Sequence, residues 1–347
     1  GLFLAALDQT IIATALASIV EEFKSFSSLG FVVTAYMLTT TITVPLAGKL
    51  SDMFGRRPML ITGVTVFTLG SLLSGLSPSI EWLIAWRALQ GIGGGIITSQ
   101  AFTIVGDLFS PRERGRWQGF IGAVFGMSSV VGPLIGGWLT DGQQILGMTT
   151  DWRWTFYINV PIGIVAAIII AANLPNIKHD TEHFPDYKGA AFISVALAAL
   201  VLAVDNTDVI FKGLIDGGVS LLAIQTVLWI TALVAGALFI RTEHTAKQPI
   251  LPLTFFKKRT YALLTVVALL FGAAFMGSIL YLTQFKQQVY GASASQAGMM
   301  LLPMVGGMMV SSITTGQLVS KLGRYKPFIV TGFTIATLSI LSLVTLN

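Results

Sequence analysis

Eleven apolar stretches of about twenty residues, separated by short polar loops, constrain the fold of this 347-residue chain more than any other feature. An α-helix needs about 20 apolar residues to cross the hydrocarbon core of a bilayer, so each stretch predicts a membrane-spanning helix. The predicted spans are residues 1–21, 29–51, 58–77, 80–106, 116–140, 154–174, 189–205, 217–240, 260–284, 294–319 and 326–347. The sequence therefore predicts an all-α membrane protein in which no connection is long enough for a soluble domain.

The composition agrees with a membrane protein. The chain is 54% hydrophobic and 11% charged, whereas soluble domains carry about 25% charged residues. The absence of cysteine excludes disulfides, thiolate nucleophiles and cysteine-ligated metals. The chain begins and ends inside apolar stretches, at Gly1 and Asn347, so we expect it to be a segment of a longer protein.

Basic residues are distributed unequally between the two sides of the predicted bundle. Of the 21 Lys and Arg residues, 16 fall in loops on the side where the first span begins, and 4 fall in loops on the other side. Because cytoplasmic loops are enriched in Lys and Arg, this bias places the first side in the cytoplasm of a cell membrane. It also accounts for the net charge of +5 without a nucleic-acid partner.

A motif repeats within the chain. GKLSDMFGRRP (48–58) follows the second span, and GQLVSKLGRYKP (316–327) follows the tenth. Membrane transporters are often built from repeated halves. The spacing predicts a six-helix half at 1–176, an inserted helix pair at 177–258, and the first three helices of a second half at 259–347. Three more helices after Asn347 would complete fourteen.

Several motifs together resemble the major facilitator superfamily, and in particular its fourteen-span drug/proton antiporter branch. GKLSDMFGRRP resembles the loop between the second and third helices of that family, and RALQG (87–91) its fourth-helix motif. GMSSVVGPLIGG (126–137) resembles the fifth-helix antiporter motif. LDQTIIATAL (7–16) and WRWTFYINVPIG (152–163) are similar to segments of the fourteen-span branch. The second half matches more weakly, through residues 281–298.

Asp8 is predicted to lie well inside the first span, thirteen residues before Glu21 and therefore roughly 20 Å from the outer end. A carboxylate in hydrocarbon is costly unless it faces a cavity or a partner. Burial favours the protonated form of a carboxyl, so such a group can take up and release a proton. A hydrogen-bonding Asp near a helix end is the alternative, and the resemblance implies a proton-binding site.

Arg87 is a permanent cation because arginine does not lose its proton in proteins. Its charge can act on a nearby carboxylate or attract an anionic substrate. The resemblance implies that Arg87 takes part in proton transfer, with Gln90 one turn further along. Counted from Glu81, Arg87 lies roughly 10 Å nearer the outer end than Asp8, so the sequence leaves their contact open. An arginine that snorkels to the interface is the alternative.

Glycines are concentrated in the fourth and fifth predicted spans. In the fourth, a cluster over residues 91–95 predicts close approach of neighbouring helices. A nucleotide-binding glycine loop is not expected, because that motif follows a strand. In the fifth, Pro133 bends the helix, and the resemblance implies a motif that marks exporters exchanging substrate for protons. Its residues are Gly126, Gly132, Pro133, Gly136 and Gly137.

The inner loop after the second span is predicted to act as a conformational latch. Asp52 can pair with an Arg or a helix N-terminus in one conformation and release it in another. Ser320 stands at the equivalent position of the second copy, so the latch is asymmetric. A positively charged turn is the alternative. The latch candidates are Gly48, Asp52, Gly55, Arg56, Arg57, Asp107 and Arg112.

A weaker set of residues is predicted to line a substrate pocket. The tenth span is rich in methionine, which suits a promiscuous apolar pocket, although packing or lipid contact is the favoured interpretation. No metal site is expected at His179 and His183, which lie in a loop without a metal-binding motif. The pocket candidates are Tyr36, Tyr281, Gln284, Gln287 and Met304.

The resemblance implies a fold of two pseudo-repeated six-helix halves with two extra helices between them. It implies a proton-coupled antiporter that exports amphipathic or cationic organic compounds by alternating access. Such a protein uses a proton gradient and no cofactor, and it functions as a monomer in the lipid bilayer. The alternatives are a transporter of one metabolite, such as a siderophore, amino acid or antibiotic, and more remotely a membrane-embedded enzyme. An enzyme predicts paired catalytic groups inside the spans, and Asp8 is the one acidic residue well within one.

Overall fold

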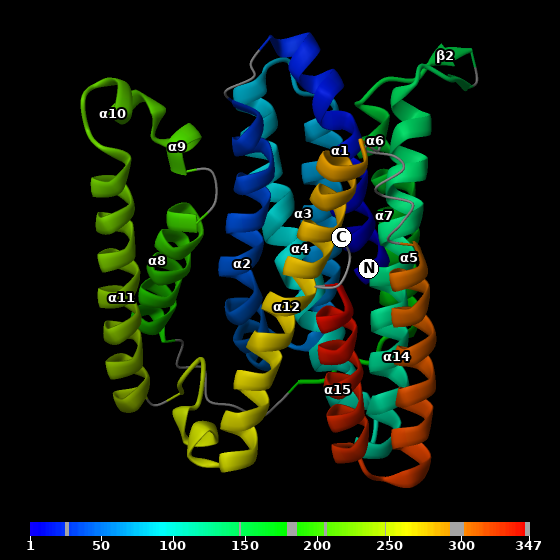
Figure 1. The fold of residues 1–347 in the computed structure, drawn as a ribbon, viewed down its shortest axis with the longest axis vertical. Helices are drawn as coiled ribbons and strands as arrows, with labels where there is room; N and C mark the ends of the chain where they lie inside the picture. Colours follow the sequence, from blue (N-terminus) through cyan, green and yellow to red (C-terminus); the bar gives the residue numbers. More distant parts are fainter. Residues whose placement is uncertain are drawn as a thin grey trace. The chain divides into compact units, whose positions relative to one another are not determined.

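Figure 1 shows the computed structural model of the chain. It describes residues 1–24, 28–145, 147–178, 186–204, 207–246, 248–291 and 302–343. Within these ranges, each of the eleven predicted stretches overlaps a helix. The helices are α1 (Leu2–Phe23), α2 (Leu29–Phe54), α3 (Arg56–Gly75), α4 (Ile80–Leu108), α5 (Pro111–Thr140), α6 (Trp154–Tyr157) with α7 (Asn159–Asn173), α8 (Tyr187–Val204), α11 (Leu221–Thr245), α12 (Arg259–Tyr290), α14 (Leu302–Leu322) and α15 (Lys326–Leu343). Among the described residues, eight helical segments are long and apolar enough to cross a membrane. The predicted all-α membrane fold is confirmed.

Small elements occupy the predicted loops. Strands β1 (Gln144–Ile145) and β2 (Met148–Thr149) form a short antiparallel hairpin, and α9 (Thr207–Ile210) and α10 (Lys212–Asp216) connect α8 to α11. A short 3-10 helix, η2, spans Leu253–Lys257.

Four predicted boundaries are wrong by four residues or more. The helix α5 begins at Pro111 rather than at residue 116, and α11 ends at Thr245 rather than at residue 240. The helix α11 begins at Leu221 rather than at residue 217, because Gly218 has a φ of +96° and Ser220 caps the new helix. The Ser220 hydroxyl accepts a hydrogen bond from the Ala223 amide at 3.2 Å. The helix α12 continues to Tyr290, beyond the predicted end at residue 284. Its polar last turns lower the hydropathy without breaking the helix.

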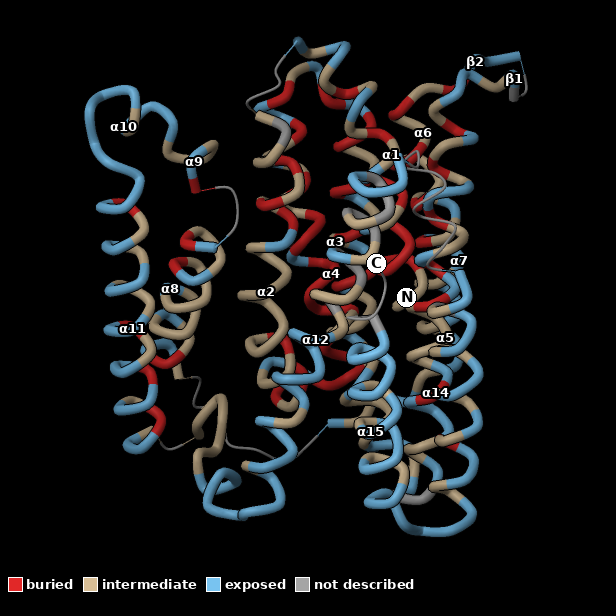
Figure 2. Tube along the Cα trace, in the orientation of Figure 1, coloured by how far each residue is buried: buried red, intermediate tan, exposed pale blue. Residues whose placement is uncertain are grey.

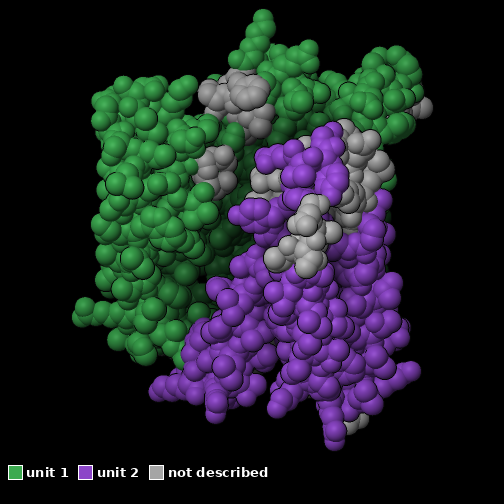
Figure 3. Space-filling view, in the orientation of Figure 1, with its two compact units in different colours: residues 1–104, 131–253 green, residues 105–130, 254–347 purple. Residues whose placement is uncertain are grey.

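The chain divides into two compact units, coloured separately in Figure 3. Unit 1 comprises residues 1–104 and 131–253, and unit 2 comprises residues 105–130 and 254–347. Within unit 2, the first part of α5 packs closely on α14, where the Ser312 hydroxyl donates to the Gly119 carbonyl at 3.2 Å. The division into a six-helix half, an inserted pair and the start of a second half stays a prediction.

The buried core of unit 1 lies mainly on α1, α3 and α4, as the red segments of Figure 2 show. One apolar cluster joins Ile12 and Ile19 of α1 to Ile80 and Leu83 of α4. The helices α8 and α11 pack mainly on each other, and α11 exposes large apolar side chains such as Leu222 at 76% and Leu233 at 70%. Such a surface is suited to contact with lipid chains.

The glycine cluster of α4 lets two neighbouring helices approach. A Cβ atom at Gly91 would lie 2.5 Å from the Tyr36 carbonyl oxygen of α2, and one at Gly95 would also meet α2 backbone. A Cβ atom at Gly93 would lie 2.7 Å from the Phe67 Cα atom of α3. Real Cβ atoms do not approach this closely, so these positions require glycine. The predicted close packing is confirmed for this cluster.

The glycines of α5 serve the same purpose against α1. A Cβ atom at Gly132 would lie 2.6 Å from the Thr10 Cβ, and one at Gly136 would lie 2.9 Å from the Ile11 carbonyl oxygen. At Gly137 nothing described lies within 4 Å. One face of α5 therefore holds α1 at short distance, and α1 carries Asp8.

Adjacent glycines of α5 give a matched test of this contact. Gly136→Ala will lower the thermal unfolding temperature, because overpacking a helix contact costs about 1–3 kcal/mol. Gly137→Ala will leave it unchanged or raise it, because alanine is favoured over glycine in a helix by roughly 1 kcal/mol. The measurement is thermal unfolding of the purified full-length protein in detergent. Equal shifts for both variants would contradict the proposed contact.

Candidate functional site

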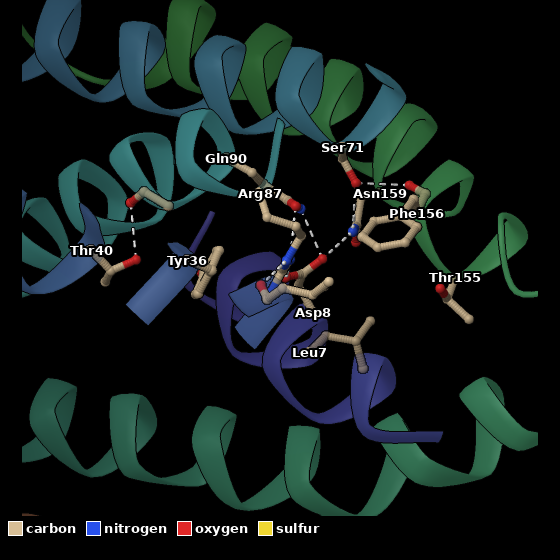
Figure 4. A network of polar contacts seen from close by, with 12 residues as sticks. Leu7, Asp8, Tyr36, Thr40, Ser71, Arg87, Gln90, Thr155, Phe156 and Asn159 are labelled. Carbon is tan, nitrogen blue, oxygen red and sulfur yellow. Dashed lines mark hydrogen bonds and ion pairs between the residues drawn. The ribbon is translucent and has the colours of Figure 1, made fainter. Parts of the chain in front are cut away.

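Asp8 lies at the centre of a buried polar network in unit 1 (Figure 4), with 2% of its surface exposed. Its Oδ2 atom accepts a hydrogen bond from Arg87 Nη1 at 2.6 Å. Its Oδ1 atom accepts one from Gln90 Nε2 at 2.8 Å and one from Asn159 Nδ2 at 2.9 Å. All three described hydrogen-bond partners of the carboxylate are donors, which suits an ionised carboxylate.

Arg87 is 1% exposed and is held by groups from three helices. Besides Asp8 on α1, its Nη1 atom donates to the Gln90 side-chain oxygen at 2.8 Å within α4. Its guanidinium carbon lies 4.2 Å from the centre of the Tyr36 ring of α2, a cation–π contact. The charge of Arg87 is thus balanced and oriented inside the protein, and the alternative of a snorkelling arginine is wrong.

Asp8 and Arg87 are in contact, although their depths counted along the sequence differ by roughly 10 Å. That count assumed that the outer ends of α1 and α4 lie at the same level. In the structure, residues of α1 and of the start of α4 share one apolar cluster, and Arg87 Nη1 lies 2.6 Å from Asp8 Oδ2.

Two further members of the network come from α3 and α7. Asn159 and Ser71 are both fully buried, and Asn159 Nδ2 donates to the Ser71 hydroxyl oxygen at 3.0 Å. The Ser71 hydroxyl in turn donates to the Phe156 carbonyl at 2.9 Å. Sequence reasoning missed both residues. Asn159 stands in WRWTFYINVPIG, and a polar residue in this apolar segment is the signal that could have identified it as a site residue.

The segment before α6 fixes Asn159 in place. Trp152 is 2% exposed and donates to a Glu22 carboxylate oxygen at 2.6 Å, and Arg153 binds the same carboxylate with two nitrogens at 2.6 and 2.8 Å. Glu22 is at the outer end of α1. The motif thus attaches the start of α6 and α7 to α1, and Asn159 follows at the level of Asp8.

A cavity of about 230 Å³ opens beside the network within unit 1. Arg87 and Tyr36 form part of its wall. In Figure 4, Tyr36 lies on the other side of Arg87 from Asn159 and Ser71. The rest of the wall is apolar or uncharged. The lining residues are Gln9, Ile12, Val33, Tyr36, Met37, Thr40, Thr41 and Arg87.

The predicted latch residues of the loop after α2 lie together. Asp52 Oδ1 pairs with Arg56 Nη2 at 2.6 Å, and Arg56 is 4% exposed and also bonds Ser51. Arg57 donates to the Ala171 carbonyl at the end of α7. Gly55 has a φ of +98°, a backbone conformation that glycine adopts more readily than other residues. The loop is therefore folded onto α7, and its action as a latch stays a prediction.

The remaining predicted residues of the latch and of the α5 motif lie at separate positions. Gly48 lies on α2 with Ser99 nearby, Asp107 is exposed near the end of α4, and the Arg112 side chain lies outside the described residues. Gly126 is buried on α5, and Pro133 is exposed inside the same helix. The structure brings Asp8, Arg87 and Gln90 into direct contact, and it also pairs Asp52 with Arg56.

Of the predicted pocket residues, Tyr36 lines the cavity. Tyr281 on α12 is 71% exposed, and Met304 on α14 is half-buried. The side chains of Gln284 and Gln287 lie outside the described residues, as do His179 and His183. In the part of the chain that the structure describes, no group of three His, Asp or Glu side chains could hold a metal ion.

Comparison with known proteins identifies the family. The family model described as Major Facilitator Superfamily matches residues 1–347. The chain belongs to the major facilitator superfamily. The family is one of multi-pass integral membrane transporters and not of enzymes.

Two named relatives come from Bacillus subtilis (strain 168). Multidrug transporter protein MdtP is 38% identical over 347 residues, which are 100% of this chain and 61% of that protein. Multidrug resistance protein 3 is 36% identical over 321 residues, which are 92% of this chain and 60% of that protein. The chain therefore spans about three fifths of the length of these relatives.

The fold is also that of a solved structure. The human organic anion transporter MFSD10 (TETRAN) matches with a TM-score of 0.62 and 19% identity, over 91% of this chain and 70% of that one. At this identity the likeness supports the major facilitator fold alone.

Proposed function

We propose that the full-length protein is a proton-coupled antiporter that exports amphipathic or cationic organic compounds. The observation that carries this proposal is the buried network in which Asp8 is the one acidic side chain, paired with Arg87 at 2.6 Å. Ionisable groups inside membrane spans are costly and mark ion and proton pathways. The named relatives, which are multidrug transporters, support an organic substrate.

Asp8 is the proposed proton-binding residue. In its ionised form, the carboxylate balances Arg87. Proton uptake would remove that balance and leave the Arg87 charge to find another partner, such as a carbonyl group or a substrate anion. The charge balance at this buried site therefore differs between the two protonation states, which is the requirement for coupling protonation to a change of conformation.

The cavity beside Arg87 supports the amphipathic part of the proposed substrate class, because Arg87 is the one charged residue among the described residues of its wall and would repel a cationic group there. Its wall combines apolar side chains such as Ile12 and Met37 with uncharged polar groups such as Gln9 and Thr40. Pockets of this kind bind organic molecules through apolar contact and a few hydrogen bonds. We propose that it forms the part of the substrate site that this chain contributes.

Transport would follow alternating access between two halves. A proton from outside binds Asp8 as substrate leaves, and the inward-facing state releases the proton. The loops rich in Lys and Arg would face the cytoplasm of the cell membrane. The α5 glycines would support the movement, the loop after α2 would act as the latch, and the protein would function as a monomer.

The test uses the full-length protein in sealed vesicles with an imposed pH gradient. Efflux of a lipophilic cation dye is followed in wild type, in Asp8→Asn, and in the control Asp216→Asn, which changes an exposed carboxylate on α10. We expect gradient-driven efflux in wild type and the control, and its loss in Asp8→Asn. Normal efflux in Asp8→Asn would place the coupling site elsewhere. Absence of dye efflux in wild type would favour a carrier of one metabolite, to be found by a substrate screen.

A further inference from the structure

The amide oxygen of Asn159 is buried and has no hydrogen-bond partner among the residues that the structure describes. Buried polar atoms without a partner are rare and call for a physical explanation. The same amide is otherwise fully used, because its Nδ2 atom donates to both Asp8 and Ser71. The free oxygen therefore lies on a side chain that already contacts the proposed proton site.

The three described contacts of Asp8 are all with donors, which suits its ionised form. Gln90 Nε2 and Asn159 Nδ2 donate to Oδ1, and Arg87 Nη1 donates to Oδ2. If Asp8 takes up its proton on Oδ1, the new O–H group faces one of the two amide donors. Uptake at Oδ1 thus requires one of the two amides to turn its oxygen toward Asp8.

The two amides differ in how easily they can do this. The Gln90 side-chain oxygen already accepts a hydrogen bond from the Arg87 guanidinium at 2.8 Å, so turning Gln90 would break a charge-assisted bond. The Asn159 oxygen has no bond to lose. When Asp8 is protonated, turning Asn159 by half a rotation exchanges its bond to Asp8 for one from the new O–H group and gives up its neutral bond to Ser71. Of the charged and titratable groups described around Asp8, Arg87 carries only donors, and the Tyr36 hydroxyl, whose oxygen could accept, makes no hydrogen bond to Asp8.

We propose that Asn159 is a two-state positioning residue for proton binding at Asp8. Its amide nitrogen donates to Asp8 when the carboxylate is ionised. After Asp8 takes up a proton, the amide turns, and its oxygen accepts the hydrogen bond from the new O–H group. No covalent bond other than the O–H bond of Asp8 is formed or broken. This inference rests on the proposed role of Asp8 in proton coupling.

The test is infrared difference spectroscopy of the reconstituted full-length protein during a pH titration. The band of interest is the carboxyl C=O stretch that disappears in Asp8→Asn. In Asn159→Leu, we expect the midpoint of this band to move to higher pH by about one unit, a tenfold change, because a bond to a charged group is stronger than the neutral bond that replaces it. We also expect the band to move to higher wavenumber, because protonated Asp8 loses its acceptor.

Gln90→Leu is the matched control. It removes a donor to ionised Asp8 and leaves the Asn159 acceptor in place. Its midpoint should also move to higher pH, while the wavenumber of the band stays at the wild-type value. A band that shifts equally in both variants would overturn the assignment to Asn159.

Ser71→Ala tests the same mechanism with less risk to folding. It removes the acceptor that favours the ionised-state orientation of Asn159, so the midpoint should rise by less than in Asn159→Leu and the wavenumber should not change. A folded Asn159→Leu with unchanged midpoint and wavenumber, or an unchanged midpoint in Ser71→Ala, would overturn the proposal. If wild type shows no Asp8 band at any pH, the proposed function itself fails, which is a different result.

Discussion

Arg87→Gln will destabilise the folded protein by about 3–5 kcal/mol, because it leaves the buried carboxylate of Asp8 without its cation. Both side chains are at most 2% exposed, so solvent cannot replace the lost charge. Asp8→Asn combined with Arg87→Gln removes both charges and should recover much of this loss. The measurement is thermal unfolding of the purified full-length protein in detergent.

The pH dependence of the stability of Arg87→Gln provides a second readout. A protonated Asp8 carries no charge, so lowering the pH should restore part of the stability of Arg87→Gln. The double variant has no carboxylate at this position and should lack that gain. A double variant as unstable as Arg87→Gln at all pH values would mean that packing of the arginine side chain, rather than charge balance, causes the loss.

Gly93→Ala will destabilise the protein toward the upper end of the usual overpacking cost, at about 3 kcal/mol. The three atoms nearest to a Cβ at this position all belong to the backbone of α3, namely atoms of Gly63 and Phe67. Backbone atoms cannot rotate away as the Thr14 hydroxyl beside Gly136 can. The helices α3 and α4 must therefore separate, which weakens the packing around Gln90 and Arg87.

Gly106→Ala is the control in the same helix, because nothing described lies within 4 Å of that position. We expect its unfolding temperature to equal or exceed that of wild type. Thermal unfolding of both variants in detergent distinguishes them. A wild-type unfolding temperature for Gly93→Ala would show that α3 and α4 are not in close contact there.

The helices of this protein could be predicted from the sequence because length and hydropathy determine which segments cross a bilayer. The boundaries that failed depend on other properties. Gly218 and Ser220 set the start of α11 through turn conformation and capping, and the polar end of α12 is helical by propensity rather than by hydropathy. The β1–β2 hairpin consists of four paired residues, too few for a pattern.

The candidate site could be predicted in part. Asp8 and Arg87 were recognisable because charges within apolar stretches are rare. Their contact was not, because it depends on how α1 and α4 pack against each other. Asn159 and Ser71 are uncharged, and such residues are common in membrane helices. Their importance comes from the meeting of α1, α3 and α7 around one carboxylate.

The enclosure of Asp8 also bears on energetic efficiency. Three donors surround the carboxylate, and 2% of its surface is exposed. If Asp8 carries the proton, exchange with water requires one of these donors to move first. A hydronium ion reaching the adjacent cavity meets the positive face of Arg87 before it meets the carboxylate. This arrangement limits passive proton leak, so an idle transporter would dissipate little of the membrane gradient.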